Sequence, residues 1–157
     1  MKNENLQIDD IDRMILDIIQ TGFPLVSHPY AVIGEMVGVS EDEALDRVNS
    51  MRNKKIIRRI GANFNAQRLN WVTTLCAARV PAERIDNFVT VVNSYPGVTH
   101  NYQRTHIYNI WFTLVSPSRE HETVVLTEIS HKTGISVLNL PATKLYKVRV
   151  DFKMSNI

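Results

Sequence analysis

The chain has 157 residues and a formal net charge of only +2, a weaker basic bias than a dedicated DNA-binding protein usually shows. Hydrophobic residues make up 44% of it, enough for one or two small globular units, and no apolar run is long enough to cross a membrane. The polar N-terminus lacks the apolar core of a signal peptide, and the single cysteine, Cys76, cannot form an internal disulfide. We therefore expect a cytoplasmic protein.

The first part of the chain predicts three helices. Isoleucines fall on one helical face within residues 9–22, and Pro29 suits the first turn of a short second helix. A capping box that starts at Ser40 opens a third helix. Residues 56–60 then predict a strand that leads into a turn. Two helices joined by a tight glycine turn and followed by a small β-hairpin predict a winged helix-turn-helix domain over residues 1–65.

The remainder of the chain predicts strands and helices in the order βαββαβ. Runs rich in β-branched and apolar residues predict the strands at 71–80, 98–105, 108–116 and within 137–150. Amphipathic helices are expected after Pro81 and after Ser118. This order predicts a ferredoxin-like domain over residues 66–157, and hence an α+β fold with a hinge near residues 66–70. Such a sheet carries helices on one face only, so the other face needs a partner.

This layout resembles the leucine-responsive (Lrp/AsnC) transcription regulators, which implies a DNA-binding function. The start of the third helix argues against that function, because acidic side chains there would face the DNA phosphates. These residues are Glu41, Asp42, Glu43 and Asp46. The same acids can simply cap the helix and complement its dipole. A basic run keeps the DNA-binding alternative open, although it is more typical of a solvated face: Lys54, Lys55, Arg58 and Arg59.

The run over residues 99–106 breaks the alternation of apolar and polar residues that a half-buried strand normally has. One of its faces would carry His100, Tyr102, Arg104 and His106. The other would carry Thr99, Asn101, Gln103 and Thr105. An exposed edge strand would explain this polarity. The mixture of His, Tyr and Arg, without the lysines usual at an edge, favours a functional site.

The runs Tyr95–Arg104 (YPGVTHNYQR) and Tyr108–Phe112 (YNIWF) resemble those of siroheme decarboxylase subunits. Supporting similarities occur at Phe23–Leu25, His28–Tyr30, Ile60–Asn65 and Leu140–Ala142. The resemblance implies a carboxy-lyase that converts two acetate side chains of siroheme to methyl groups, giving didecarboxysiroheme in alternative heme or heme d1 biosynthesis. It also implies a heterodimer with a paralogous subunit. A DNA-binding regulator and a non-catalytic heme-binding or heme-sensing subunit remain the alternatives.

On this resemblance, three residues are candidates for catalysis. Decarboxylation leaves electron density that must be protonated, so the site needs a general acid. His100 is the first candidate for that acid. Two alternative roles remain open for His100: an axial ligand of the iron, or a histidine that is only structural. Arg104 suits a bidentate clamp on a carboxylate, or an ion pair with a protein acid. Tyr102 can hydrogen-bond a carboxylate or supply a proton.

Further residues are candidates for binding the macrocycle and its carboxylates. They are Tyr108, Asn109, Trp111, Lys144 and Arg149. The aromatic side chains would wall the flat ring, although tryptophan in a strand is more often part of the core. The basic ones would neutralise carboxylates, although a basic last strand is commonly a surface feature. We expect no cofactor beyond the iron of the siroheme substrate, and neither DNA nor a membrane as a partner.

Overall fold

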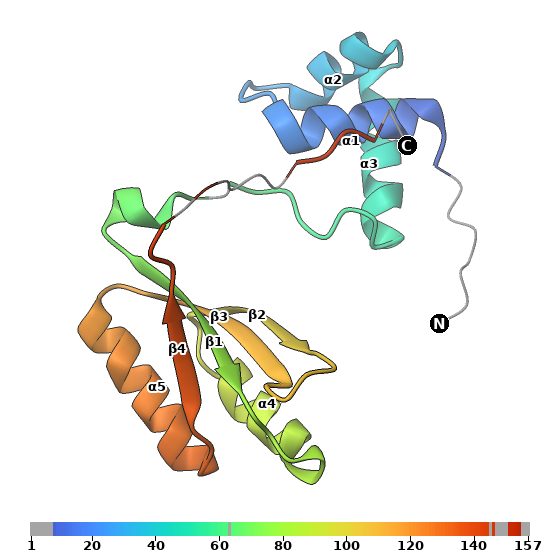
Figure 1. The fold of residues 1–157 in the computed structure, drawn as a ribbon. Helices are drawn as coiled ribbons and strands as arrows, with labels where there is room; N and C mark the ends of the chain where they lie inside the picture. Colours follow the sequence, from blue (N-terminus) through green and yellow to red (C-terminus); the bar gives the residue numbers. More distant parts are fainter. Residues whose placement is uncertain (1–7, 63, 145, 147–150, 155–157) are drawn as a thin grey trace. The chain divides into compact units, whose positions relative to one another are not determined.

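The structure of the chain is a computed structural model that describes residues 8–62, 64–144, 146 and 151–154. The chain divides into two compact units, residues 1–62 with 148–157 and residues 63–147 (Figure 1). The first unit is helical, and the second combines a sheet with helices. The α+β class predicted from the sequence is therefore confirmed. No helix among the described residues is both long and apolar enough to span a membrane.

Three helices build the first unit: α1 (Asp10–Gly22), α2 (Pro29–Val37) and α3 (Glu41–Asn53). The Asp9 side chain caps α1 and accepts the Asp12 backbone N–H at 2.8 Å. The Ser40 hydroxyl caps α3 by accepting the Glu43 backbone N–H at 3.2 Å. Buried apolar side chains from all three helices, together with Ile57 after α3, form one core: Ile15, Ile33, Ala44, Val48, Met51 and Ile57.

The turn between α2 and α3 depends on two glycines. Gly38 ends α2 with a φ of +80°, a left-handed conformation that glycine adopts without steric cost. A Cβ atom placed on Gly34 would lie 2.6 Å from the Val39 carbonyl oxygen. Only glycine therefore allows the chain to pass this closely over α2. The predicted helix-turn-helix is confirmed.

The strand predicted at residues 56–60 is wrong, and the described residues between α3 and the second unit contain no wing hairpin. Lys55 adopts a left-handed φ of 62° directly after α3. The Ile56 backbone N–H then donates to the Met51 carbonyl oxygen at 2.9 Å, as in a Schellman helix end. This turn directs Ile57 into the helical core. The backbone therefore completes α3, and the β propensity of the isoleucines is overridden.

The second unit has the expected βαββαβ order. After a short 3-10 helix at Ala66–Leu69, its elements are β1 (Val72–Ala78), a 3-10 turn at Ala82–Arg84, α4 (Ile85–Asn93), β2 (Val98–Gln103), β3 (Ile110–Ser116), α5 (Arg119–Thr133) and β4 (Val137–Pro141). The strands pair antiparallel in the order β2-β3-β1-β4. This is the ferredoxin-like arrangement. The last strand ends at Pro141, because proline has no N–H to continue the ladder.

The two helices of the second unit cover the same face of the sheet (Figure 1). Side chains of α4 and α5 pack there against alternate residues of the strands, including Cys76, Phe112 and Leu114, which are at most 1% exposed. A buried carboxylate, Glu122 of α5, is satisfied on this face by Arg119 at 2.9 Å and by Asn139 of β4 at 2.7 Å. The intervening residues of the strands point to the opposite face.

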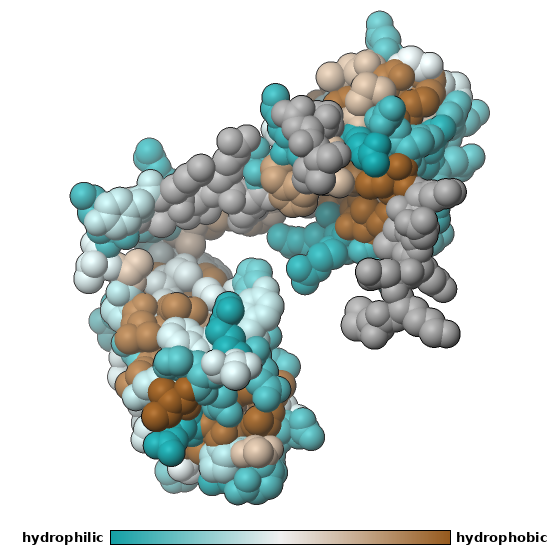
Figure 2. Space-filling view, turned by 45° about the vertical axis from the view of Figure 1, so that its right-hand side comes forward, coloured by the Kyte–Doolittle hydropathy of each residue, from teal (hydrophilic) through white to brown (hydrophobic). Residues whose placement is uncertain are grey.

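That opposite face exposes apolar side chains that a soluble monomer would normally cover. Leu75, Leu138 and Leu140 are each about 40% exposed, and Leu140 pairs directly with Leu75 across β1 and β4. The brown areas in Figure 2 show that apolar side chains reach the surface of the sheet-bearing unit. An apolar sheet face of this kind is typical of an interaction surface.

Candidate functional site

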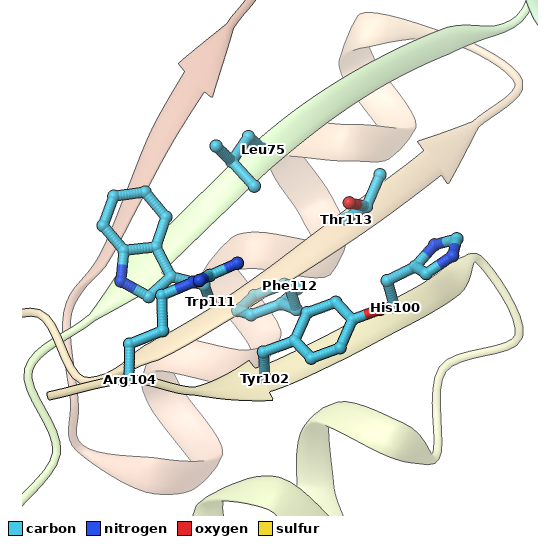
Figure 3. A pocket seen from close by; sticks show the side chains of 7 residues that line it. All are labelled: Leu75, His100, Tyr102, Arg104, Trp111, Phe112 and Thr113. Carbon is cyan, nitrogen blue, oxygen red and sulfur yellow. The ribbon is translucent and has the colours of Figure 1, made fainter. Parts of the chain in front are cut away.

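A hollow of about 420 Å³ lies on the sheet, where side chains from three strands stand together (Figure 3). It is lined by Leu75, His100, Tyr102, Arg104, Trp111, Phe112 and Thr113. Phe112 borders the hollow, although its side chain belongs to the buried core on the helix-covered face of the sheet. The hollow thus contains all three residues that the sequence predicted to be catalytic. It also contains Trp111, which was predicted to bind the substrate.

The pairing of β2 with β3 explains why these residues meet. Tyr102 lies opposite Trp111, and His100 lies opposite Thr113, after an irregularity in register between Val98 and His100. Because alternate residues of a strand share a face, His100, Tyr102 and Trp111 stand on one side of the sheet. Asn101 faces the other side, where its Nδ2 donates to Asn93 of α4 at 2.9 Å. The predicted division into two faces therefore holds for His100, Tyr102 and Asn101. The predicted strand at residues 98–105 is too long, because β2 ends at Gln103 and residues 104–106 lie in the loop that follows.

His100 and Tyr102 form an exposed pair of stacked rings. Their ring centroids are 6.2 Å apart with an angle of 25° between the planes. The Nδ1 atom of His100 lies 3.1 Å from the Thr99 hydroxyl oxygen, so Nε2 is the ring atom that can act toward a ligand. No group of three His, Cys, Asp or Glu side chains in the described part of the chain could hold a metal ion.

Arg104 presents a cation to the hollow. Its Cζ atom lies 5.7 Å from the centre of the Tyr102 ring, a contact that orients the guanidinium without neutralising it. No carboxylate of the described residues forms an ion pair with Arg104; the ion pairs found there involve other cations. Of the two roles open to Arg104, the structure therefore favours the clamp over an ion pair within the chain.

The other predicted binding residues that the structure describes do not line the hollow. The Asn109 side-chain oxygen accepts the Val80 backbone N–H at 2.9 Å, and its Nδ2 donates to the Val80 carbonyl oxygen at 2.8 Å, so the side chain secures the start of β3. Tyr108 contributes its backbone carbonyl to Trp111 Nε1, at 2.6 Å. Lys144 is exposed, and its Nζ lies 5.0 Å from the centre of the Tyr146 ring. Arg149 lies outside the described residues.

Three lining residues, Leu75, Phe112 and Thr113, were not among the predicted site residues. Leu75 is in β1, and its partner across the β1–β3 ladder is Thr113. The local sequence of these residues carries only a strand pattern. What places them in the hollow is the alternation of side chains within β1 and β3, combined with the pairing of these strands.

The β2 strand is also an edge strand, since the sheet order begins with it. Edge strands are often polar because polarity discourages pairing with other chains. That requirement explains exposed Thr99 and Gln103 equally well. It does not explain why an imidazole, a phenol and a guanidinium converge with an indole on the face without helices. This convergence favours a ligand site.

The basic side chain in the first turns of α3, Arg47, is paired with carboxylates of the same unit. Arg47 Nη1 lies 2.7 Å from Asp9 and 3.0 Å from Asp12, and its Nε lies 2.9 Å from Glu43. These carboxylates raise the pKa of Arg47 above its ordinary value. The first turn of α3 itself is acidic at Glu41, Asp42 and Glu43. The face that would enter a DNA groove is therefore negatively charged.

Comparison with known proteins agrees with both units. A family model of the siroheme decarboxylase NirDL-like HTH domain matches residues 12–58, and a model of the AsnC-like ligand binding domain matches residues 68–147. The siroheme decarboxylase alpha subunit of Desulfovibrio desulfuricans is 58% identical over 149 residues, which cover 95% of this chain and 86% of that protein.

Two solved structures place the fold in context. The siroheme decarboxylase NirDL, solved with an iron-uroporphyrin III analogue, is 31% identical with a TM-score of 0.64. The match covers 88% of this chain and 47% of that one, so this chain spans about half its length. An AsnC family transcriptional regulator from Agrobacterium tumefaciens matches with a TM-score of 0.77 at 23% identity, over 92% of this chain and 96% of that one. The second likeness concerns the fold alone, because one fold can host different functions.

Proposed function

The chain belongs to the siroheme decarboxylase family, and on this basis we propose that it is a subunit of an enzyme that removes the carboxyl groups of two acetate side chains of siroheme. The product would be didecarboxysiroheme, an intermediate of heme or heme d1 biosynthesis. The observation that carries this proposal is the 58% identity to a siroheme decarboxylase alpha subunit over 95% of the chain. The hollow with His100, Tyr102 and Arg104 supplies groups suited to the reaction.

The chemistry at each acetate arm requires one proton and no oxidant. The bond between the methylene carbon and the carboxylate carbon breaks, and carbon dioxide leaves. The electron pair of that bond remains on the methylene carbon, which takes a proton and becomes a methyl group. Atoms and electrons balance with the proton alone, so the proposal includes no cofactor beyond the iron within the substrate. A proton donor close to the methylene carbon is the main requirement.

His100 is the residue to which we assign the proton. Its imidazole is exposed on the hollow, where a substrate can reach it, and histidine is the side chain that most often serves as a general acid. Tyr102, stacked beside it, would hydrogen-bond the carboxylate or relay a proton. As an alternative role, His100 Nε2 would bind the iron of the macrocycle as an axial ligand. The two roles predict different spectra, as described below.

Arg104 and Trp111 would hold the substrate. The guanidinium can grip a carboxylate of siroheme with two parallel hydrogen bonds, and it carries no ion pair with a described carboxylate that must first be broken. The indole of Trp111 offers a flat apolar wall to the ring. We extend the binding role to Tyr108 and Lys144 only as outer contacts, since neither of these two lines the hollow. Arg149, which lies outside the described residues, stays a candidate for binding a carboxylate.

The partner we propose is a paralogous subunit in a heterodimer. A hollow of about 420 Å³ on one side of a sheet leaves the other face of a large flat ring uncovered. The exposed leucines beside it, Leu75, Leu138 and Leu140, provide an apolar rim for a second sheet. In this assembly the sheet-bearing unit, residues 63–147, would form the ligand-binding and dimerisation domain, and the helical unit, residues 1–62 with 148–157, would form the helix-turn-helix domain. A cytoplasmic location suits the single, buried cysteine.

A DNA-binding regulator is the less favoured function. The acidic start of α3 and the three carboxylates around Arg47 oppose contact with phosphates. A gel-shift assay with the neighbouring promoter tests this alternative directly. Tight binding that weakens steeply with salt would favour the regulator. A subunit that binds heme without chemistry would instead bind siroheme in the full complex and release no product.

The decisive experiment is turnover of siroheme by the chain purified with its partner, without oxygen, followed by mass spectrometry. Loss of two carbon dioxide units from siroheme is expected. His100→Ala and Arg104→Ala should each slow the loss, whereas His121→Ala, an exposed histidine of α5, should not. If both site variants turn over siroheme at the normal rate, the site assignment is wrong.

The absorption spectrum of bound siroheme separates the two roles of His100. If His100 is an axial ligand, His100→Ala shifts the Soret band of the bound substrate. If His100 is the proton donor, the band stays in place and only the rate of decarboxylation falls.

A further inference from the structure

The loop between β2 and β3 is held together by hydrogen bonds of its own backbone. The Arg104 N–H donates to the Asn109 carbonyl oxygen at 2.8 Å, and the His106 N–H donates to the Arg104 carbonyl oxygen at 3.0 Å. The loop therefore links the guanidinium-bearing residue of the hollow directly to His106. This histidine does not itself line the hollow.

One side chain reaches into this backbone network. The Nδ1 atom of His106 accepts the Tyr108 backbone N–H at 3.1 Å. The carbonyl of the same residue, Tyr108, accepts the indole Nε1–H of Trp111 at 2.6 Å. The Tyr108 backbone is thus bound twice: its N–H donates to His106, and its carbonyl oxygen accepts from Trp111.

The His106 ring also contacts the two residues that these hydrogen bonds connect, Tyr108 and Trp111. The His106 ring stacks on the Tyr108 ring with centroids 6.2 Å apart, and it lies 6.4 Å from the Trp111 ring at an angle of 56°. Trp111 is only half-buried, so few core contacts restrict its indole. Its orientation toward the hollow depends on the Tyr108 carbonyl, and that carbonyl depends on the loop.

We infer that His106 is a positioning residue of the siroheme site, whose Nδ1 fixes the Tyr108 backbone so that the Tyr108 carbonyl holds the Trp111 indole against the hollow. The inference rests on the proposed function, in which Trp111 walls the substrate ring. It assigns His106 to the binding of the macrocycle and leaves the chemical step to His100. An acceptor at the position of Nδ1 is what fixes the loop, because water could satisfy this exposed N–H but would not hold the Tyr108 backbone in one place.

The test compares two substitutions that differ only in this acceptor. His106→Ala removes it. His106→Asn keeps an oxygen as many bonds from Cα as Nδ1, and removes the ring. Loss of one net hydrogen bond corresponds to roughly a three- to tenfold change in binding. We therefore expect His106→Ala to raise KM for siroheme by about three- to tenfold, and to leave kcat within about twofold. His106→Asn should restore most of the KM.

A spectroscopic measurement follows Trp111 without substrate. The chain has two tryptophans, and Trp71 lies outside the hollow. In full-length chain with Trp71→Phe, all tryptophan fluorescence comes from Trp111. His106→Ala in this background should shift the emission to longer wavelength, as the freed indole contacts more water, and His106→Asn should shift it less.

Two results would overturn the inference. One is unchanged KM and unchanged Trp111 emission in His106→Ala. The other is a large fall in kcat that His106→Asn does not restore while the emission stays constant, because that pattern identifies a chemical role. If the unmodified complex does not decarboxylate siroheme, the proposed function fails, and the Trp111 emission still decides whether His106 positions the indole.

Discussion

Replacing Arg104 by alanine is expected to weaken siroheme binding and to leave the stability of the chain unchanged. The side chain is exposed, its one described contact is with the face of the Tyr102 ring, and no described carboxylate pairs with it. Removing the side chain therefore leaves no buried group without a partner. The free energy of unfolding of Arg104→Ala should differ from that of the wild type by no more than about 0.5 kcal/mol. A charge-assisted hydrogen bond contributes about 1.5–3 kcal/mol to binding.

For an exposed guanidinium we take the lower end of that range, so KM for siroheme should rise by at least about tenfold. Arg104→Lys should fall between the wild type and Arg104→Ala, because an ammonium keeps the charge and loses the two-pronged geometry. The assays are steady-state decarboxylation by the complex and thermal unfolding of the chain. Arg68→Ala, an exposed arginine in the 3-10 helix before β1, is the matched control. An unchanged KM, or a melting temperature lowered by many degrees, would refute the clamp.

Three predictions concern the stability and chemistry of residues away from the site. Burial, together with the charge of Glu122, raises the pKa of the Cys76 thiol to about 12, so a thiol reagent at neutral pH should label Cys76 only after unfolding; rapid labelling of the folded chain would contradict this. Lys55 has a left-handed φ of 62°, so Lys55→Gly should stabilise the first unit by about 0.5 kcal/mol in urea unfolding, and a loss of stability would show that the lysine is not strained. Hydrogen bonding from the Asp12 backbone, and then from Arg47, lowers the pKa of Asp9. The stability contributed by the Asp9 carboxylate is therefore complete above its usual pKa and lost as the pH falls through the lowered value. Asp9→Asn should accordingly unfold at lower urea than the wild type near neutrality, with a gap that closes below about pH 4; a gap independent of pH would exclude this carboxylate as the cause.

Several elements could be predicted because their signals are local. Ser40 and Ser118 cap helices in the structure as their positions in the sequence indicate. Gly38 and Gly134 end helices in left-handed conformations. The strand pattern of the second unit likewise predicted the βαββαβ order, although the last strand is shorter than expected.

Other features could not be predicted because distant residues decide them. The isoleucines at 56–57 have high β propensity, yet the backbone there completes α3 and Ile57 joins the helical core. Residues near the C-terminus give a second example. The Met154 backbone N–H donates to Asp17 of α1 at 2.8 Å, a contact between residues far apart in the chain that no local pattern indicates.

The sequence by itself determined that residues 99–106 form an unusual polar strand, and the resemblance of this region pointed to siroheme. Side-chain alternation also separated His100, Tyr102 and Arg104 from Asn101, because it follows from backbone geometry alone. Only the tertiary structure decided what faces them. The pairing of β2 with β3 and of β3 with β1 brings Trp111 and Leu75 to the hollow, and it assigns Asn109 to the support of Val80. Strand register depends on pairing between distant segments, whereas caps and alternation depend on neighbours in the chain.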